Sequence, residues 1–484
     1  MPLIQLLRLI CRGIPTSFRV PAFPDKSPFD FPPMIDLPAR RFRCTVAFVI
    51  AGCLSVPPTV VVAQTAHQHP LSSQVPWPTK SGPSANGTVP TTMAGRIWKT
   101  WDWESGQGID WTTSLEHGGH STPVVGSGRI WLTSATDDGK RQFITAVDSA
   151  SGKVVHHRML FQNNTPEPLG NPVNNYAAPT PYLEPNAVYV HFGTYGTARL
   201  DVESGATVWQ RRDINVRHFR GPGSSPVVVG DLVILTFDGI DHQFVTALDK
   251  HTGRTVWTTP RSTDFGDLDD DGRPLRDGDL RKAFGTPAVF RRGDQTQIVS
   301  VGSRAAFGYD AGTGEEIWTV RHDDYNASAQ PLVFRDTVII NTGSRGAELM
   351  AIRIDDSTVG DVTDTHVVWN HDRGNARLSY PVLCNDMVIW ITDSGVATAV
   401  DAAEGFELWK HRIGGNYVAS PLVDDDTVYF FNSDGQCVIA KVDHDGLTEQ
   451  RRNTIGESMT ASPAVSGDGL ILRAGKTLAK ITVH

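Results

Sequence analysis

Residues 247–257 carry the stretch that decides the fold, Ala247-Leu248-Asp249-Lys250-His251-Thr252-Gly253-Arg254-Thr255-Val256-Trp257. An apolar strand end runs into an Asp-x-x-Thr-Gly turn, and a second strand follows and closes on Trp. Side chains alternate on both sides of the turn, and Gly stands where the turn needs a positive φ. The stretch therefore predicts a β-hairpin.

The same hairpin recurs along the chain. Clear copies run from Leu200 to Trp209, from Tyr309 to Trp318 and from Val400 to Trp409. Weaker copies run from Val147 to Val155 and from Ile352 to Trp369. A hairpin repeated at this spacing indicates one structural unit used many times.

A Pro at the start of another alternating strand accompanies each repeat. These prolines are Pro123, Pro181, Pro226, Pro287, Pro331, Pro381, Pro421 and Pro463. Their spacing ranges from 40 residues, between Pro381 and Pro421, to 61 residues, between Pro226 and Pro287. A period in the forties with four short strands per unit is typical of a β-propeller blade, and Pro at the first position of a strand removes no ladder hydrogen bond.

The two ends of the repeat region complement each other. Residues 109–113 read as a lone outer strand, whereas residues 464–483 offer inner strands without a Trp-bearing outer strand. We expect residues 110–114 to complete the last blade, which closes the ring and removes free sheet edges. The predicted fold is all-β: an eight-bladed β-propeller of four-stranded antiparallel blades over residues 109–484, its last blade closed by an N-terminal strand.

Tryptophan ends most of the outer strands. The expected blade-docking residues are Trp111, Trp209, Trp257, Trp318, Trp369 and Trp409. Burying about 200 Å² of indole at about 25 cal/mol/Å² contributes up to about 5 kcal/mol. We expect each ring to pack across the seam to the next blade, above its Thr-Gly turn, so the repeat itself carries no chemistry.

Residues 1–63 read as a leader. Arg40, Arg41 and Arg43 precede an apolar run, so we expect translation to start at Met34 and a signal peptide to span about 34–63. Cys53 ends a lipobox-like Ile-Ala-Gly-Cys, which leaves lipid attachment open beside simple secretion, the alternative we favour. The chain is therefore expected to be exported, to the periplasm or the outside, with no transmembrane domain in the mature protein.

The net charge, the linker and the cysteines limit the functions to be considered. A formal net charge of -9 gives no support for nucleic-acid binding. Residues 64–108 read as a polar, Pro- and Gly-rich linker before the propeller. Cys384 and Cys437 lie in consecutive repeats, so a disulfide and two separate buried thiols are both open.

The repeats resemble a known family, the pyrroloquinoline-quinone (PQQ) repeat propellers, whose Ala-x-Asp-x-x-Thr-Gly-x-x-x-Trp motif matches Ala247 to Trp257. The family is that of the quinoprotein alcohol dehydrogenases and of a non-catalytic lipoprotein propeller of outer-membrane barrel assembly. The resemblance implies an eight-bladed propeller, with PQQ and calcium as the cofactors to be considered. No adjacent Cys-Cys pair like that of the dehydrogenases is present, so no catalytic residue is carried over.

In a propeller, the loops before the inner strands and between the second and third strands open on one face, at the channel mouth. The ligand-binding residues expected there are His120, Asn175, Tyr176, His191, His218, Arg220, Asp238, Asp241, His242, His322, Asn326, Arg345 and Arg377. Arg forks and aromatic rings suit an anionic or sugar-like ligand, whereas several of these residues also fit ordinary tight turns. The four histidines of blades one to three are further considered as metal ligands.

A long acidic insertion separates Trp257 from Pro287. Within it, Asp267-x-Asp269-x-Asp271-Gly272 has the opening of a calcium loop, but Gly278 stands where the twelfth-position Glu belongs. Calcium binding by Asp267, Asp269 and Asp271 and a solvated acidic loop are both open.

Two functions follow from these patterns. We favour an exported, non-catalytic binding or scaffold propeller, expected to be a monomer, whose mouth binds an envelope protein, a glycan or a small anion. The alternative is a PQQ-dependent alcohol or sugar dehydrogenase with a non-standard pocket.

Overall fold

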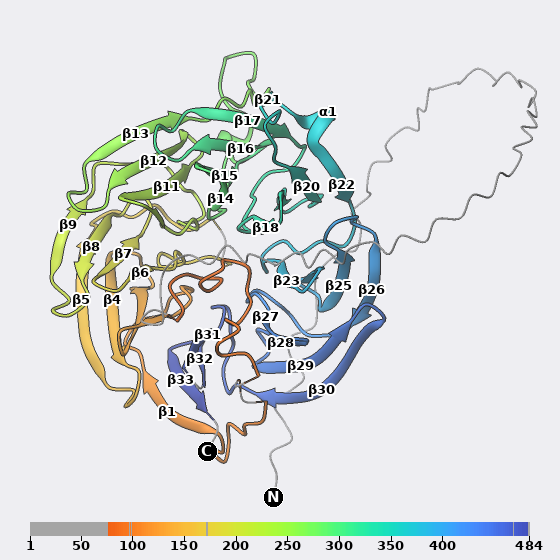
Figure 1. Ribbon diagram of the computed structural model, residues 1–484. Helices are drawn as coiled ribbons and strands as arrows, with labels where there is room; N and C mark the ends of the chain where they lie inside the picture. Colours follow the sequence, from red (N-terminus) through yellow and green to blue (C-terminus); the bar gives the residue numbers. More distant parts are fainter. Residues whose placement is uncertain (1–75, 96, 98, 171–172, 468, 483–484) are drawn as a thin grey trace, which may run out of the picture. The chain divides into compact units, whose positions relative to one another are not determined.

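The computed structural model describes residues 76–95, 97, 99–170, 173–467 and 469–482. The expected leader, with Met34 and Cys53, lies outside these residues. The described residues belong to one compact unit. In its described part, eight β-sheets are arranged around a ring (Figure 1).

Each sheet is one blade with four antiparallel strands, and in seven of the eight blades these strands run in chain order from the inside outward. Blade 1 contains β2 (Val124–Gly126), β3 (Arg129–Ala135), β4 (Arg141–Asp148) and β5 (Val154–Gln162). Blade 2 contains β6 (Tyr182–Glu184), β7 (Ala187–His191), β8 (Thr197–Asp201) and β9 (Thr207–Arg211). Blade 3 contains β10 (Val227–Val229), β11 (Leu232–Asp238), β12 (Gln243–Asp249) and β13 (Thr255–Pro260). Blade 4 contains β14 (Ala288–Arg292), β15 (Gln295–Val301), β16 (Ala305–Asp310) and β17 (Glu316–Arg321).

The second half of the ring repeats the pattern. Blade 5 contains β18 (Leu332–Phe334), β19 (Thr337–Asn341), β20 (Leu349–Arg353) and β22 (Val367–His371). Blade 6 contains β23 (Val382–Cys384), β24 (Met387–Ile391), β25 (Val396–Asp401) and β26 (Glu407–Arg412). Blade 7 contains β27 (Leu422–Asp424), β28 (Thr427–Phe431), β29 (Gln436–Asp443) and β30 (Gly446–Thr454). Blade 8 contains β31 (Ala464–Ser466), β32 (Gly469–Ala474), β33 (Thr477–Thr482) and β1 (Ile109–Ser114).

The ring closes as the sequence predicts. Strand β1 pairs antiparallel with β33, with Thr112 opposite Ala479 and Thr113 opposite Leu478. The first described strand thus becomes the outer strand of the last blade, beside the blue C-terminal strands in Figure 1. The eight-bladed, all-β prediction is confirmed, and closure gives blade 8 its fourth, outer strand.

The core lies between neighbouring blades. Middle strands such as β7 are buried along their whole length, because both faces of a blade pack against other blades. Outer strands such as β13 alternate, with Trp257 buried and Val256 exposed. Ile234 of blade 3 packs in one cluster with Ile298 and Phe307 of blade 4.

Five of the six expected docking tryptophans donate their indole N–H to a backbone carbonyl in the next blade. The acceptors are Ser149 for Trp111, Lys250 for Trp209, Ala311 for Trp257, Ala402 for Trp369 and Asp443 for Trp409, at 2.8–3.3 Å. A turn glycine lies against four of these rings; a Cβ on Gly253 would lie 2.7 Å from the Trp209 ring. The indole therefore seals the seam by packing and by one directional hydrogen bond.

Trp318 lies differently. Its indole N–H donates to Gln297 Oε1 of its own blade at 2.9 Å. The turn that the next blade would offer is replaced by a longer excursion with β21 (Gly360–Asp361) and the short helix α1 (Thr363–His366). β21 pairs in parallel with β17, which carries Trp318, and so covers the outer edge of blade 4.

Several residues in the range expected to be a linker, among them Trp77, Pro78 and Thr88, contact the ring. Trp77 forms a β-bridge with Val125, and Thr88 forms one with Val423. Leu183 N–H donates to Pro78 O. These contacts reach the inner strands of blades 1, 2 and 7, and the red-orange segment lies at the centre of Figure 1.

The helical content of the described residues is α1 and the short 3-10 helix η1 (Leu275–Gly278). No helix in this part of the chain has the length and apolar character needed to cross a membrane.

Candidate functional site

The antiparallel order of each blade places two kinds of loop on one face: the hairpin between the second and third strands, and the connection from one blade to the next. This face is the channel mouth. The predicted mouth residues lie in or beside these loops, but they do not converge on one centre.

Two of them anchor the insertion that follows blade 3. Asp238, at the end of β11, pairs with Arg261 at 2.7 Å, and both side chains are almost fully buried. Arg220 pairs with Asp279 at 3.3 Å. A buried carboxylate that holds a guanidinium fork is already neutralised, so these two residues position residues 261–282.

Several other predicted residues also make internal contacts. Asp241 Oδ1 accepts the backbone N–H groups of Arg217 and His242. Asn175 Oδ1 accepts from Ala177 N–H, and the Tyr176 hydroxyl donates to Glu167 O. Arg377 pairs with Asp393 at 2.5 Å. These contacts stabilise loops in the way expected of turn residues.

The four histidines predicted as metal ligands, His120, His191, His218 and His242, belong to no group of potential metal ligands in the described part of the chain. Burial lowers the pKa of His191 to about 3 and that of His218 to about 4. His191 Nδ1 lies 2.8 Å from Thr197 Oγ1, and His218 Nε2 accepts from Thr194 N–H. Burial lowers the pKa of His120 to about 4, and the nearby charges of Arg473 and Lys80 act in the same direction. His242 is exposed.

A pocket of about 500 Å³ opens on the mouth face between blades 4 and 5, and the insertion closes one side of it. Its charged and aromatic lining consists of Arg276, Arg304, Asp323, Asp324, Tyr325, Arg345 and Glu348. Of the residues predicted for the mouth, Arg345 lines this pocket. We call it the blade 4–5 pocket.

Two of the three acidic groups of the blade 4–5 pocket, Asp324 and Glu348, are engaged by hydrogen bonds, whereas the Asp323 side chain is exposed. The Asp324 carboxylate accepts the backbone N–H groups of Tyr325, Arg345 and Gly346. Glu348 accepts from Asn370. The guanidiniums of Arg276 and Arg345 are exposed and form no ion pair or side-chain hydrogen bond within the described residues, which leaves two cationic forks directed to solvent or a ligand.

The segment 322–326 beside the pocket holds two unsatisfied polar atoms. His322 Nε2 and Asn326 Oδ1 are buried and lack a hydrogen-bond partner within the described residues. Burial lowers the pKa of His322 to about 4, so its ring is neutral at physiological pH. Asn326 also holds a left-handed backbone conformation, φ 61°. Unpaired buried groups and backbone strain are typical of binding loops.

Asp267, Asp269 and Asp271, considered as calcium ligands, do not form a ligand cage. The Asp267 carboxylate is held by the Arg281 guanidinium, with the closest contact at 2.5 Å. Asp269 Oδ1 accepts the backbone N–H groups of Asp271 and Arg273. The Asp271 side chain lies 3.4 Å from Arg273, so the three carboxylates do not gather around one point.

Cys384 and Cys437 are free thiols, so the disulfide alternative is not realised. Cys384 ends the inner strand of blade 6, and its thiol donates to Asp425 O at 3.4 Å. Cys437 lies in β29, the third strand of blade 7. Two separate buried thiols, the other alternative, are what the structure contains.

Sequence reasoning missed Arg276 and two histidine–carboxylate neighbours. Arg276 lies in the acidic insertion, where the Asp spacing points to calcium. Glu116, His117 and His157 form the one group of three or more potential metal ligands found in the described residues. Glu116 and His117 follow the strand that closes the ring, a signal that points to blade 1 as their neighbour.

Comparisons with known proteins agree with this architecture. The sequence profile described as "Outer membrane protein assembly factor BamB" matches residues 111–359 and 310–482. Curated proteins give no significant match.

Solved structures of both branches share the fold. BamB from Moraxella catarrhalis has a TM-score of 0.54 at 13% identity, covering 78% of this chain and 97% of that one. A quinohemoprotein alcohol dehydrogenase from Comamonas testosteroni has a TM-score of 0.60 at 13% identity, covering 84% of this chain and 80% of that one. A europium-containing methanol dehydrogenase has a TM-score of 0.58 at 11% identity, covering 83% of this chain and 90% of that one. These likenesses show the fold. The BamB profile matches most of the chain, which shows that the chain belongs to the PQQ-repeat propeller family.

Proposed function

We propose that this protein is a non-catalytic binding propeller of the cell envelope, and that its blade 4–5 pocket binds an acidic segment of a partner protein. The observation that carries the proposal is the pair of guanidiniums, Arg276 and Arg345, that lack protein partners in the described residues at the edge of a pocket of about 500 Å³. Arg forks match carboxylates bidentately, so two of them select a ligand with closely spaced acids.

The pocket is built to keep these two arginines available. Asp324, the acid that lies deepest, is satisfied by backbone N–H groups. The insertion that carries Arg276 is fixed to blade 3 by the buried pair Arg261–Asp238. A fixed pocket that presents unpaired charge loses little entropy when it binds.

Envelope localisation rests on the leader-like residues 34–63 and on the family description, which names an outer-membrane assembly factor. The partner is accordingly sought among envelope proteins.

The binding test uses a fluorescent hexaglutamate peptide and anisotropy at low salt. Removing one charge-assisted contact costs about 1.5–3 kcal/mol, so Arg345→Ala and Arg276→Ala each weaken binding by roughly tenfold or more. Arg254→Ala is the matched control, because Arg254 is also exposed but lies in the turn between the third and fourth strands, on the opposite face. Equal affinities for all three variants and the native protein refute the proposed pocket.

The second candidate is a PQQ-dependent dehydrogenase, favoured by the likeness to two dehydrogenase structures. Against it, the five cysteines include no adjacent pair. The test adds PQQ with Ca²⁺ to the purified protein and follows alcohol-dependent dye reduction. Turnover that a chelator abolishes establishes this candidate and removes the first.

A further inference from the structure

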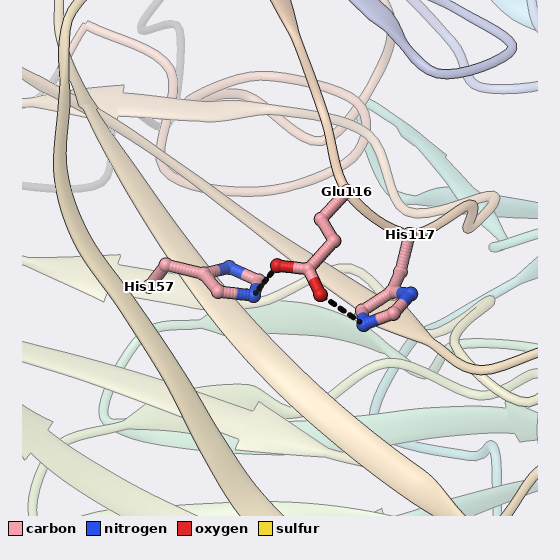
Figure 2. A group of neighbouring side chains, drawn as sticks. All are labelled: Glu116, His117 and His157. Atoms are coloured by element: carbon pink, nitrogen blue, oxygen red, sulfur yellow. Dashed lines mark ion pairs between the residues drawn. The ribbon is translucent and has the colours of Figure 1, made fainter.

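A second cluster of functional groups lies between blades 8 and 1, with no residue in common with the blade 4–5 pocket. Glu116 and His117 follow β1, and His157 belongs to β5, the outer strand of blade 1. Figure 2 shows the carboxylate between the two imidazole rings. Glu116 Oε1 lies 3.3 Å from His117 Nε2, and Oε2 lies 3.3 Å from His157 Nε2.

These separations suit a shared metal ion. Zinc binds His nitrogen at about 2.0–2.1 Å and carboxylate oxygen at about 2.0–2.2 Å, which puts neighbouring ligands of a tetrahedral site about 3.3–3.5 Å apart. A charge-assisted hydrogen bond would be about 2.7–2.9 Å. His117 Nε2 is shielded from solvent and makes no hydrogen bond in the described part of the chain, so its contact with Glu116 lacks hydrogen-bond geometry.

The rings are held in place from behind. Phe143 stacks on His157 with centroids 5.1 Å apart and an interplanar angle of 8°, and it contacts the His117 ring at 4.4 Å. His157 Nδ1 lies 2.9 Å from Thr145 Oγ1. When Nδ1 carries the proton and donates to Thr145, Nε2 presents its lone pair to the carboxylate side, as in the outer-shell contacts of metal-bound histidines.

The cluster is open on one side. The Glu116 side chain is 67% exposed, so solvent reaches the fourth coordination position.

We propose that Glu116, His117 and His157 form a binding site for one zinc-class divalent transition-metal ion, with water as the fourth ligand. The site joins the strand that closes the ring to the outer strand of the first blade. It is independent of the acidic-peptide pocket.

The test titrates the untagged protein, cleared of metal, with Zn²⁺ by calorimetry and with Co²⁺ by absorption spectroscopy. We expect one Zn²⁺ per chain and the visible bands of tetrahedral Co²⁺. Glu116→Gln and His157→Ala each lower the affinity at least about tenfold and abolish the Co²⁺ bands. His411→Ala is the matched control, since His411 is exposed on β26, an outer strand of blade 6 outside the cluster.

A further variant leaves all three ligands in place and tests whether the residue behind His157 supports metal binding. Thr145→Val removes the outer-shell partner of His157, and we expect an affinity loss of about 10–100-fold. Circular dichroism in chelator shows whether each variant stays folded. Absence of stoichiometric Zn²⁺ binding, or native affinity in folded Glu116→Gln and His157→Ala variants, overturns the proposal.

Discussion

The seam between blades 2 and 3 allows a direct test of how the repeats hold the ring together. Gly253 has φ 72°, and a Cβ there would lie 2.7 Å from Cδ2 of Trp209. Gly230, in the same blade, has φ 57° and would place a Cβ in open space. Gly253→Ala and Gly230→Ala therefore share the backbone penalty and differ in the contact with Trp209.

The structure gives the size of the difference. An Ala in the left-handed region costs about 1–2 kcal/mol at either position. At Gly253 the indole must also shift, which costs about 1–3 kcal/mol of overpacking and about 1 kcal/mol for the hydrogen bond from Trp209 to Lys250 O. We expect Gly253→Ala to lower the free energy of unfolding by about 2–4 kcal/mol more than Gly230→Ala.

Urea denaturation followed by circular dichroism measures both variants, alone and combined with Trp209→Ala. Without the indole the clash is gone, so in that background the two Gly→Ala changes should cost the same amount. Equal losses in the native background, or an unchanged difference after Trp209→Ala, would refute the role assigned to the ring.

Three further predictions concern the pocket, acid stability and the thiols. Gly278→Ala would place a Cβ 2.3 Å from Ile240 O at φ 81°, so it should shift the insertion and weaken hexaglutamate binding severalfold; unchanged anisotropy contradicts a positioned insertion. The folded-state pKa of His191 is about 3, below the unfolded value of about 6.5, so the unfolded state binds more protons between these values. Stability is therefore complete above about pH 6.5 and falls as the pH drops toward 3, and His191→Gln should flatten this fall in urea titrations; equal slopes contradict it. Cys384 and Cys437 should resist iodoacetamide in the native protein and react after denaturation without reductant, because burial raises the pKa of both thiols; labelling that needs a reductant would reveal a disulfide.

The fold could be predicted because the repeated sequence motif specifies its own local structure. The turn Asp249–Gly253 fixes a hairpin, and its copies fix the period. The missing outer strand at the end and the lone strand at Asp110 then determine the closure. The orientation of Trp318 could not be predicted in this way, because it depends on a turn in the next blade that the sequence lengthens.

For the site, the sequence could predict which face of the propeller carries it, but not which residues meet there. Asp238 and Arg220 lie at the mouth as expected, but their partners Arg261 and Asp279 belong to an insertion whose path no periodicity specifies. His157 reads as an outer-strand residue until ring closure brings Glu116 beside it. Long-range partners of this kind need coordinates.

Three departures from the repeat lie on blades 4 and 5. The insertion 261–282 enters blade 4, Trp318 turns inward within it, and blade 5 replaces the Thr-Gly turn by β21 and α1. In a repeat protein the repeated residues maintain the packing between neighbours, so specificity is expected where the repeat is broken. The blade 4–5 pocket lies between these two blades and takes Arg276 from the insertion. If binding instead maps to a regular seam, where blades differ little from one another, the ligand recognises the repeat itself, and other propellers with the same motif should compete for it equally well.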